Sequence, residues 1–461
     1  MRDWSARARA EVAGAKLGDA RLASRLETVS GSVASHAGES LPKQAGSVAA
    51  LEATYRFLNN ESVTPEAILE PHQRATAARA RAQAGVVLVA HDTTEFDFGK
   101  RKQLGELNGH RKGFFCHASL VVSADEGHAP LGVVATENLF REQLGHRARG
   151  KKSSEGLRWQ RGFDRAAAAM KGIPCIHVMD REGDAYELMS HIAGADDADF
   201  VIRARQDRVL GPGEFHYLSE ALEKSVPLVG RSFPVGKRAL NPSPRHRKRH
   251  PPREEHLAKA LIHATSVHVR RPAAAKSGPD VLPLNVVHVR ELLENGDPST
   301  IEWILWTTLP VDTAEQVLAV VDAYRGRWRI EELFKSLKTG CQFERLQLES
   351  RRALTNALSV FLPVAWLLLH LRVLSRDPIA PARAVLSELQ IVCLRAVYAK
   401  QENKTLPAVL SAREVLLALA RIGGHLKNNG EPGWLVLHRG IHDVLVAEIG
   451  ALAVAEIAIN P

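Results

Sequence analysis

Three patterns of hydrophobic and polar positions follow one another along the chain. Up to about residue 80, apolar residues recur at helical spacing, and Asp19 and the Thr64-Pro65 pair stand where helices are expected to begin. Residues 86–98 are instead β-branched and aromatic, which predicts a central strand. Helical spacing returns beyond about residue 345, with helices expected at 350–374, 380–400 and 411–421 and a last one from about 438. The chain therefore predicts helical regions at both ends of a strand-rich middle.

The strand-rich middle has the pattern of a mixed α/β sheet. After the strand at 86–98, two more strands precede an alternation of helix, strand, helix and strand. From about residue 206 the pattern changes, and two alternating strands predict a β-rich insertion before a last strand and a helix that begins near Thr313. The expected strands are 114–123, 131–136, 173–179, 200–204, 263–269, 284–291 and 301–308, and the expected helices between them are 154–171 and 182–193.

A chain of 461 residues is too long for one ordinary hydrophobic core, so several domains are expected. The predicted fold is an α/β core interrupted by a β-rich insertion, with all-α domains at both ends. The expected boundaries are a helical domain at 1–80, the first part of the core at 81–205, the insertion at 206–300, the second part of the core at 301–375 and a helical domain at 376–461.

The most hydrophobic stretch, residues 357–371, is expected to be a buried helix. It is shorter than the roughly 20 residues that span a bilayer, and it contains Pro363 and His370. The N-terminal segment is charged and has no apolar signal-peptide core. The four cysteines lie far apart and form no metal-binding motif, which fits a reducing compartment. A cytoplasmic protein without a membrane partner is therefore expected.

The formal net charge of +9 favours an anionic partner, either nucleic acid or a membrane surface. Basic residues concentrate between positions 231 and 253, where several prolines argue against regular structure. This stretch predicts a basic loop, and the alternative is a solvated linker. A membrane surface is disfavoured because these basic residues do not lie on an amphipathic helix. The loop includes Arg245, Arg247, Lys248 and Arg249.

Residues 324–338 predict a helix that carries a narrow polar stripe. At about 100° per residue, Tyr324, Arg327, Glu331 and Lys338 fall on one side, next to an apolar side. A hydroxyl, a guanidinium, a carboxylate and an ammonium group together would suit a site that handles a metal ion and a phosphate. The alternative is an ordinary amphipathic helix with charge pairs four residues apart.

Two further carboxylates, Asp92 and Asp180, lie in or after apolar strands. A carboxylate in such a place is costly unless it is paired or binds a cation. Together with Glu331 they form a ligand set of oxygen atoms only, which suits Mg²⁺ or Mn²⁺. The alternatives are a turn residue for Asp92 and a helix N-cap for Asp180.

The order Asp92, Asp180 and Glu331 resembles that of the DDE transposases, whose catalytic domain has the RNase H-like fold. The words DTTEFDFG and DREGDAYEL surround the two aspartates, and YRGRWRIEELFKSLKTGC is similar to the Y-R-E-K signature of one bacterial insertion-sequence branch. LGDARLASRL, YRFLNN and IGGHLKNNGEPGW, nearer the chain ends, also resemble that branch. The resemblance thus extends over nearly the whole chain.

This resemblance implies a role for each matching residue. Asp92, Asp180 and Glu331 would bind Mg²⁺, with Mn²⁺ as a substitute and two ions in all. Glu332 points elsewhere on the helix and is not the equivalent carboxylate. Tyr324 and Arg327 would hold a phosphate and Lys338 the DNA backbone. Trp303 would stack on a base flipped from the transposon end, and its alternative is a core tryptophan beside Trp306.

The resemblance also implies double-stranded DNA, both transposon ends and target, as the partner. Arg21 and Arg25 would lie in the N-terminal end-binding domain, and the basic loop would contact DNA. The C-terminal helices would form a homodimer. The implied activity is cut-and-paste transposition, in which water nicks each end, the 3′-hydroxyl forms a hairpin, and the opened ends join target DNA. The alternatives are an RNase H-like nuclease without strand transfer and a catalytically silent DNA-binding inhibitor.

Overall fold

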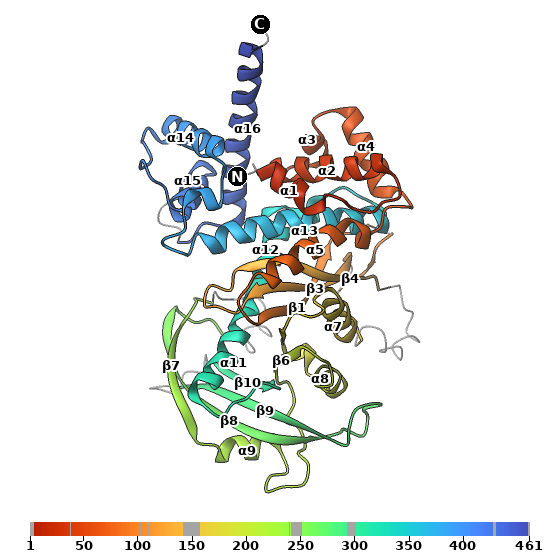
Figure 1. Ribbon diagram of the computed structural model, residues 1–461, viewed down its shortest axis with the longest axis vertical. Helices are drawn as coiled ribbons and strands as arrows, with labels where there is room; N and C mark the ends of the chain where they lie inside the picture. The colour runs from red at the N-terminus through yellow and green to blue at the C-terminus, as the bar shows by residue number, and fades with distance from the viewer. Residues whose placement is uncertain are drawn as a thin grey trace. The chain divides into compact units, whose positions relative to one another are not determined.

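The computed structural model describes residues 4–36, 38–101, 103–107, 111–141, 157–238, 240, 251–292, 301–426 and 430–459. The chain divides into two units. Unit 1 consists of Met1–Val87, Asp92–Met170 and Arg329–Pro461, and unit 2 of Leu88–His91 and Lys171–Trp328. Each unit therefore combines segments that are far apart in the sequence. In unit 1, for example, helices drawn in red lie beside helices drawn in blue (Figure 1).

Unit 1 begins with helices whose starts are set by side-chain caps. Asp19 accepts the backbone N–H of Arg21, and Thr64 accepts that of Ala67. The predicted starts at Asp19 and at Thr64-Pro65 are thereby confirmed. The helices are α1 (Trp4–Val12), α2 (Ala20–Ser35), α3 (Leu41–Ala45), α4 (Val48–Asn59) and α5 (Pro65–Arg81).

A buried ionic network joins α1 to α5. The Glu11 carboxylate lies 2.5 Å from His72 Nδ1 and 2.8 Å from Arg79 Nη1. His72 Nε2 accepts the backbone N–H of Val133 at 3.0 Å, so Nδ1 carries the proton donated to Glu11. Burial alone would raise the pKa of Glu11, but His72 and Arg79 outweigh it and lower the pKa to about 2. The network therefore stabilises the ionised carboxylate.

The strands of unit 1 form an antiparallel arrangement around β3 (Lys112–Ser123). β3 neighbours β1 (Val87–Asp97) and pairs with β2 (Gly105–Glu106) and β4 (Pro130–Leu139). Helix α7 (Arg158–Ala169) packs on β3 and β4 through the buried Trp159 and Phe163. These strands and α7 confirm the first part of the predicted α/β pattern.

Helix α13 (Arg351–Leu374) is the central helix of unit 1, and α2, α4 and α5 pack against it (Figure 1). Among the described helices it alone has the length and composition to cross a membrane. Of the most apolar 18-residue stretch within this helix, 83% is buried inside the protein. Trp366 donates its indole N–H to the Pro130 carbonyl at 2.8 Å. The predicted buried helix is therefore confirmed.

The C-terminal part of unit 1 is helical, as predicted, but one helix begins later than expected. The expected helix at 380–400 is wrong at its start, because the Ser387 side chain caps a helix that begins at Glu388. A short 3-10 turn, η5 (Ala382–Ala384), precedes it. The remaining helices are α14 (Glu388–Glu402), α15 (Ala412–Ile422) and α16 (Trp434–Ile459).

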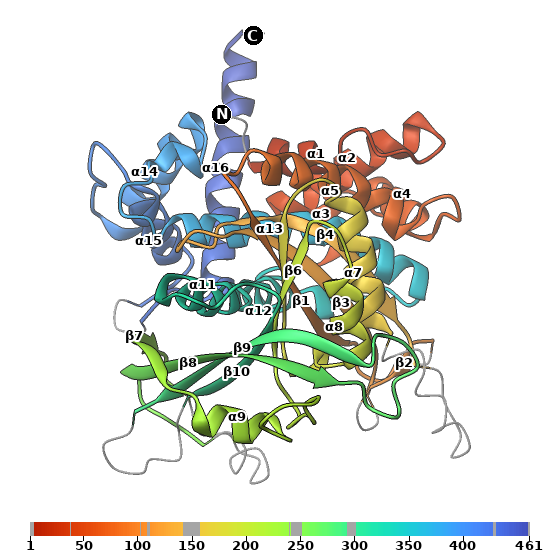
Figure 2. The same cartoon turned by 60° about the horizontal axis from the view of Figure 1, so that its bottom comes forward.

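Unit 2 is a sheet with helices. Next to residues 88–91 of β1, the strands follow in the order β5, β6, β10, β9, β8 and β7. β5 and β6 are parallel, and each later pair of neighbours, from β6 and β10 to β8 and β7, is antiparallel. Helix α11 (Ala314–Gly326) packs against β5, β6 and β9. Figure 2 shows α11 beside β9. The strands are β5 (Cys175–Met179), β6 (Ala198–Arg203), β7 (Pro227–Val235), β8 (His256–Arg270), β9 (Val281–Glu291) and β10 (Glu302–Thr307).

Two short helical elements follow β5, and another precedes β7. They are the 3-10 turn η2 (Arg181–Gly183), α8 (Tyr186–Ala193) and α9 (Leu218–Lys224). The middle of the chain therefore forms a mixed α/β sheet, and the regions before and after it in the sequence are helical. This agrees with the sequence prediction.

The basic stretch is less loop-like than expected. Strand β7 continues to Val235 and includes Arg231, which pairs with Asp322 at 2.7 Å. Lys237 pairs with Glu254 at 2.9 Å. Arg238 and Arg253 form an isolated bridge that extends the pairing of β7 with β8. The prediction that prolines exclude regular structure throughout 231–253 is therefore wrong at both ends of this stretch.

Candidate active site

Asp92 lies within β1, directly after a buried apolar run. Residues 87–91 are buried, whereas Asp92 itself is partly exposed. Its Oδ1 atom accepts the backbone N–H of Thr93 at 2.7 Å. The apolar residues place the strand in the core, and the partial exposure leaves the carboxylate near solvent.

Asp180 directly follows β5, whose five residues are all buried. Its Oδ1 atom accepts the backbone N–H of Glu182 at 2.8 Å, so Asp180 caps the 3-10 turn η2. The alternative that Asp180 is an N-cap is thus correct, although the cap is of a 3-10 turn and uses one oxygen atom. Because a carboxylate carries two oxygen atoms, capping is compatible with metal binding.

The segment after Thr313 is not one continuous α-helix. Helix α11 ends at Gly326, α12 spans Trp328–Lys335, and a π-helical turn, η3 (Ser336–Gly340), follows. The prediction of a single α-helix over 324–338 is therefore wrong. The position of Lys338 on the polar stripe is wrong too, because it was calculated with the α-helical angle of about 100° per residue. Tyr324 and Arg327 belong to unit 2, and Glu331 and Lys338 to unit 1.

The two neighbouring glutamates of α12 have different surroundings. Glu332 is 8% exposed and forms ion pairs with Arg329 at 2.7 Å and Arg376 at 2.6 Å. Burial would raise the pKa of Glu332, but these two arginines lower it. Glu331 is partly exposed on the same helix. Glu332 is therefore committed to a structural role, as expected if Glu331 is the functional carboxylate.

Three aromatic and basic side chains gather in unit 2 around Tyr324. The Trp303 ring is 5.4 Å from the Tyr324 ring in an edge-on contact and is stacked on Phe233, also at 5.4 Å. Trp306 is fully buried, whereas Trp303 is only partly so. The Arg327 guanidinium lies 6.0 Å from the Tyr324 ring. Packing thus holds Trp303, Tyr324 and Arg327 close together.

Lys338 lies near the end of β1 in unit 1. Its Nζ atom is 3.9 Å from Glu344 and 5.5 Å from the Phe96 ring. Glu344 also accepts the backbone N–H of Asp97 at 2.9 Å. The Lys338 ammonium is therefore held beside the strand that carries Asp92.

Two arginines near Asp180 did not emerge from the sequence. Burial lowers the pKa of Arg181, the charge of Arg203 lowers it further, and Tyr324 and Asp180 oppose this shift. Arg203 Nη2 donates to the Glu302 carbonyl, while its buried Nε atom has no partner among the described residues. Arg181 thus interacts with Asp180 and Tyr324, and Arg203 adds a second positive charge beside Arg181. Arg181 lies in the word DREGD, but only the fold brings Arg203 near it.

The predicted N-terminal contacts differ in exposure. Arg21 is exposed and pairs with the cap residue Asp19 at 2.9 Å, and Arg25 is partly exposed on α2. Arg245, Arg247, Lys248 and Arg249 lie outside the described residues.

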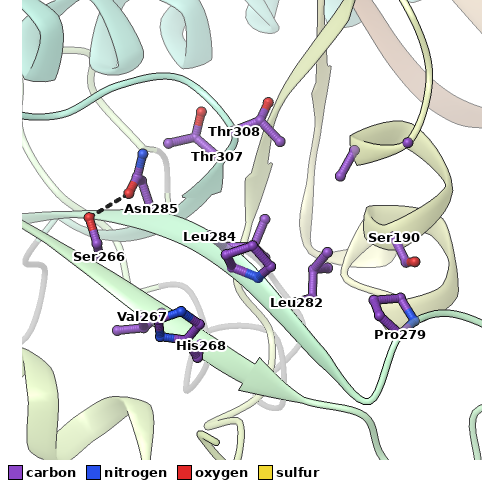
Figure 3. Close-up of a pocket in the computed structure, with 13 residues that line it drawn as sticks. Ser190, Ser266, Val267, His268, Pro279, Leu282, Leu284, Asn285, Thr307 and Thr308 are labelled. Atoms are coloured by element: carbon purple, nitrogen blue, oxygen red, sulfur yellow. Dashed lines mark hydrogen bonds between the residues drawn. The ribbon is translucent and has the colours of Figure 1, made fainter. Parts of the chain in front are cut away.

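A separate pocket of about 600 Å³ lies in unit 2 between α8 and the strands β8 and β9 (Figure 3). Ser266 of β8 donates to its cross-strand neighbour Asn285 of β9 at 2.7 Å, and Asn285 donates to the Leu309 carbonyl. None of the predicted site residues lines this pocket. This pocket is therefore not part of the candidate active site.

The carboxylates fit a divalent cation by their chemistry. All three offer oxygen atoms only and are partly exposed, which suits Mg²⁺ or Mn²⁺ better than Zn²⁺. Within the part of the chain that the structure describes, no three His, Cys, Asp or Glu side chains already form a metal-binding group. The assignment of Asp92, Asp180 and Glu331 to a metal is therefore a proposal.

Comparisons with known proteins identify the family to which the chain belongs. Residues 1–63 match the family model "Transposase DNA-binding", and residues 88–362 match "Transposase DDE domain". The solved piggyBac transposase synaptic complex with hairpin DNA is similar at 8% identity over 72% of this chain, with a TM-score of 0.32. The chain spans 56% of that protein, and a likeness this weak carries no argument. The DDE model alone covers more than half of the chain, which therefore belongs to the DDE transposase family.

Proposed function

We propose that this chain is a cut-and-paste transposase of the Y-R-E-K branch of bacterial insertion sequences. It binds the terminal inverted repeats, cleaves them through a hairpin intermediate and joins the 3′ ends to target DNA. The observation that carries the proposal is the match to the DDE domain over the segment that contains Asp92, Asp180 and Glu331. Asp92 follows the buried part of β1 and Asp180 follows the buried strand β5. Glu331 is next in sequence to Glu332, which has a structural role.

An RNase H-like core with an inserted β domain is part of this proposal. The order β4, β3, β1 in unit 1 and the order β1, β5, β6 in unit 2 support it, with β3 and β4 antiparallel and β5 and β6 parallel. The strands β7, β8 and β9 lie between β6 and β10 in sequence, where the insertion is expected.

Asp92, Asp180 and Glu331 would hold two Mg²⁺ ions, or Mn²⁺ in their place. Such ions activate the attacking hydroxyl and stabilise the leaving oxygen of a phosphodiester. Tyr324 and Arg327 would hold a phosphate through hydrogen bonds, and Arg327 suits this role because its guanidinium has donors only. Lys338 would add a point charge beside the DNA backbone.

The base-stacking role of Trp303 leads to a prediction. Replacing Trp303 with alanine should slow hairpin formation by about 5- to 150-fold, because stacking on a base is worth about 1–3 kcal/mol. The first nick should proceed at the wild-type rate, and phenylalanine at this position should restore part of the hairpin rate. Single-turnover kinetics on a labelled transposon end separate the two steps. An equal loss in both steps would remove the stacking role from Trp303.

The basic loop leads to a second prediction. Replacing Arg245, Arg247, Lys248 and Arg249 together with alanine should reduce the salt dependence of DNA binding. The slope of log K against log salt should fall by about 0.9 for each phosphate that the protein no longer neutralises, and so by up to about 3.6. Lys237→Ala is the control, because Lys237 is already paired with Glu254. Binding curves at several salt concentrations measure the slopes, and an unchanged slope would make the stretch a linker.

A homodimer that pairs two transposon ends is also proposed. In α16, Leu437, Ile441 and Leu445 are buried, whereas Val446, Ile449 and Leu452 are about half exposed. These exposed apolar residues follow one another at intervals of three and offer a surface to a second copy. The mass of the DNA-bound complex in solution tests this proposal.

Two other functions make different predictions in one experiment. The purified protein is mixed with DNA that carries the inverted repeats flanking its gene, a supercoiled target and Mg²⁺. The proposed transposase joins the cleaved ends to the target. Cleaved ends that never join would indicate a nuclease without strand transfer. Binding without any Mg²⁺-dependent cleavage would indicate an inhibitor of transposition.

A further inference from the structure

The hydroxyl of Thr93, the residue after Asp92, is held between two side chains of unit 1. Arg158 Nε donates to Thr93 Oγ1 at 3.1 Å, and Thr93 Oγ1 lies 3.0 Å from His117 Nδ1. A guanidinium has donors only, so Thr93 must accept from Arg158 and can donate its own hydrogen to His117. The hydrogen bonds therefore run in one direction, from α7 through the hydroxyl to β3.

His117 is suited to accept this hydrogen bond because it is buried and neutral. It is 1% exposed, and Trp159 meets its ring edge-on at 4.8 Å. Even a methyl group at Gly162 would overlap the ring, so α7 approaches β3 closely at this point. Burial, followed by the charges of nearby arginines, lowers the pKa of His117 to about 3. Neutral imidazole can accept at Nδ1, and the tight packing fixes its position.

The anchored threonine is coupled to Asp92 through the backbone. Its N–H donates to Asp92 Oδ1 at 2.7 Å. Successive side chains of a strand point to opposite faces, so Asp92 points away from the side on which Arg158 and His117 hold Thr93. Fixing the Thr93 side chain therefore fixes the N–H that orients the carboxylate.

We propose that Thr93 is a positioning residue for Asp92, held in place by Arg158 and His117. This inference rests on the proposed function, because it assigns Asp92 to a divalent ion. Side chains that orient a metal ligand from behind typically change metal affinity or activity by about 10- to 100-fold when they are removed. The residues that hold Thr93 lie on β3 and α7, and neither contributes a carboxylate to the proposed site.

The test is Mn²⁺ binding to the full chain, measured by calorimetry without DNA. Thr93→Val keeps the shape of the side chain but removes the hydroxyl, and it should weaken Mn²⁺ binding by about 10- to 100-fold. Thr93→Ser retains the hydroxyl and should bind like the wild type. Thr136→Val, in the partly exposed part of β4, is the matched control and should also bind like the wild type.

Arg158→Met provides a second variant, which leaves Thr93 intact but removes its donor. It should weaken Mn²⁺ binding in the same range, and it carries the test if Thr93→Val does not fold. If Thr93→Val and Arg158→Met both bind Mn²⁺ with wild-type affinity, the positioning role of Thr93 is wrong, whereas the proposed function is unaffected. Equal losses in Thr93→Val and Thr136→Val would also overturn it, since the effect would be general. Absence of Mn²⁺ binding by the wild type would instead contradict the proposed function.

Discussion

Glu331→Gln is expected to reduce Mg²⁺-dependent cleavage of a transposon end at least about a thousandfold. The change removes a negative charge from the proposed metal site but keeps the size of the side chain. Metal ions contribute several kcal/mol to the stability of a phosphodiester transition state, and about 4 kcal/mol corresponds to a thousandfold in rate. Glu331 is partly exposed, so the melting temperature should stay near that of the wild type. Single-turnover cleavage and thermal unfolding measure the two quantities.

Glu332→Gln is the matched control, because the same change is made one residue along the same helix. It removes the charge that pairs with Arg329 and Arg376. The loss of these charged hydrogen bonds should lower the free energy of unfolding by about 1.5–3 kcal/mol, and the exposed side of Arg376 keeps the cost moderate. The folded fraction should still cleave DNA. Loss of cleavage in Glu332→Gln together with normal cleavage in Glu331→Gln would contradict the assignment of Glu331 to the metal.

Acid is expected to destabilise unit 1 through Glu11. Its pKa is about 2 in the folded protein and near 4.5 without the surrounding contacts. A carboxyl whose folded-state pKa is depressed stabilises the fold above its unfolded pKa, and this stabilisation is lost as the pH falls from about 4.5 toward 2. The shift corresponds to about 3 kcal/mol.

Urea unfolding of the wild type and Glu11→Gln tests this expectation. The variant should be less stable at pH 7, and the difference should shrink as the pH falls below about 4.5. Glu39→Gln is the control, since the Glu39 carboxylate pairs with the exposed Lys43 at 3.0 Å, and a pair so open to solvent should matter little at any pH. A difference between wild type and Glu11→Gln that stays constant down to pH 3 would show that the carboxylate is not the cause.

The sequence predicts local structure well where the chemistry is local. The caps at Asp19 and Thr64 lie beside the helices that they begin. The buried strands that lead to Asp92 and Asp180 appear as uninterrupted apolar runs. In such places a few adjacent residues decide the structure, so the prediction needs no knowledge of the fold.

Prediction fails where a distant contact decides the structure. The helix after Thr313 breaks into α11, α12 and a π-helical turn, although its sequence reads as one helix. The Ser336 hydroxyl in this turn donates to the Ala365 carbonyl of α13 at 2.9 Å, a contact that helical periodicity does not encode. Likewise, Arg231 belongs to the basic stretch by sequence but lies in β7 and pairs with Asp322 of α11.

The candidate site divides in the same way. Helical spacing is enough to separate Glu331 from Glu332, and the arginines around Glu332 agree with that separation. The sequence does not indicate Arg203, because it is near Arg181 only in the folded sheet. Nor does it indicate the link from Arg158 to Thr93, since these residues are distant in the sequence and meet through α7 and β1.

Cleavage of a labelled transposon end, with the products resolved on a denaturing gel, tests whether the three carboxylates form one metal-dependent site. The wild type should nick the end and then form a hairpin in Mg²⁺ but not in EDTA. Asp92→Asn, Asp180→Asn and Glu331→Gln should each bind the end and form neither product. Cleavage by the wild type in EDTA, or normal hairpin formation by any of the three variants, would contradict the claim that these carboxylates form one metal-dependent site.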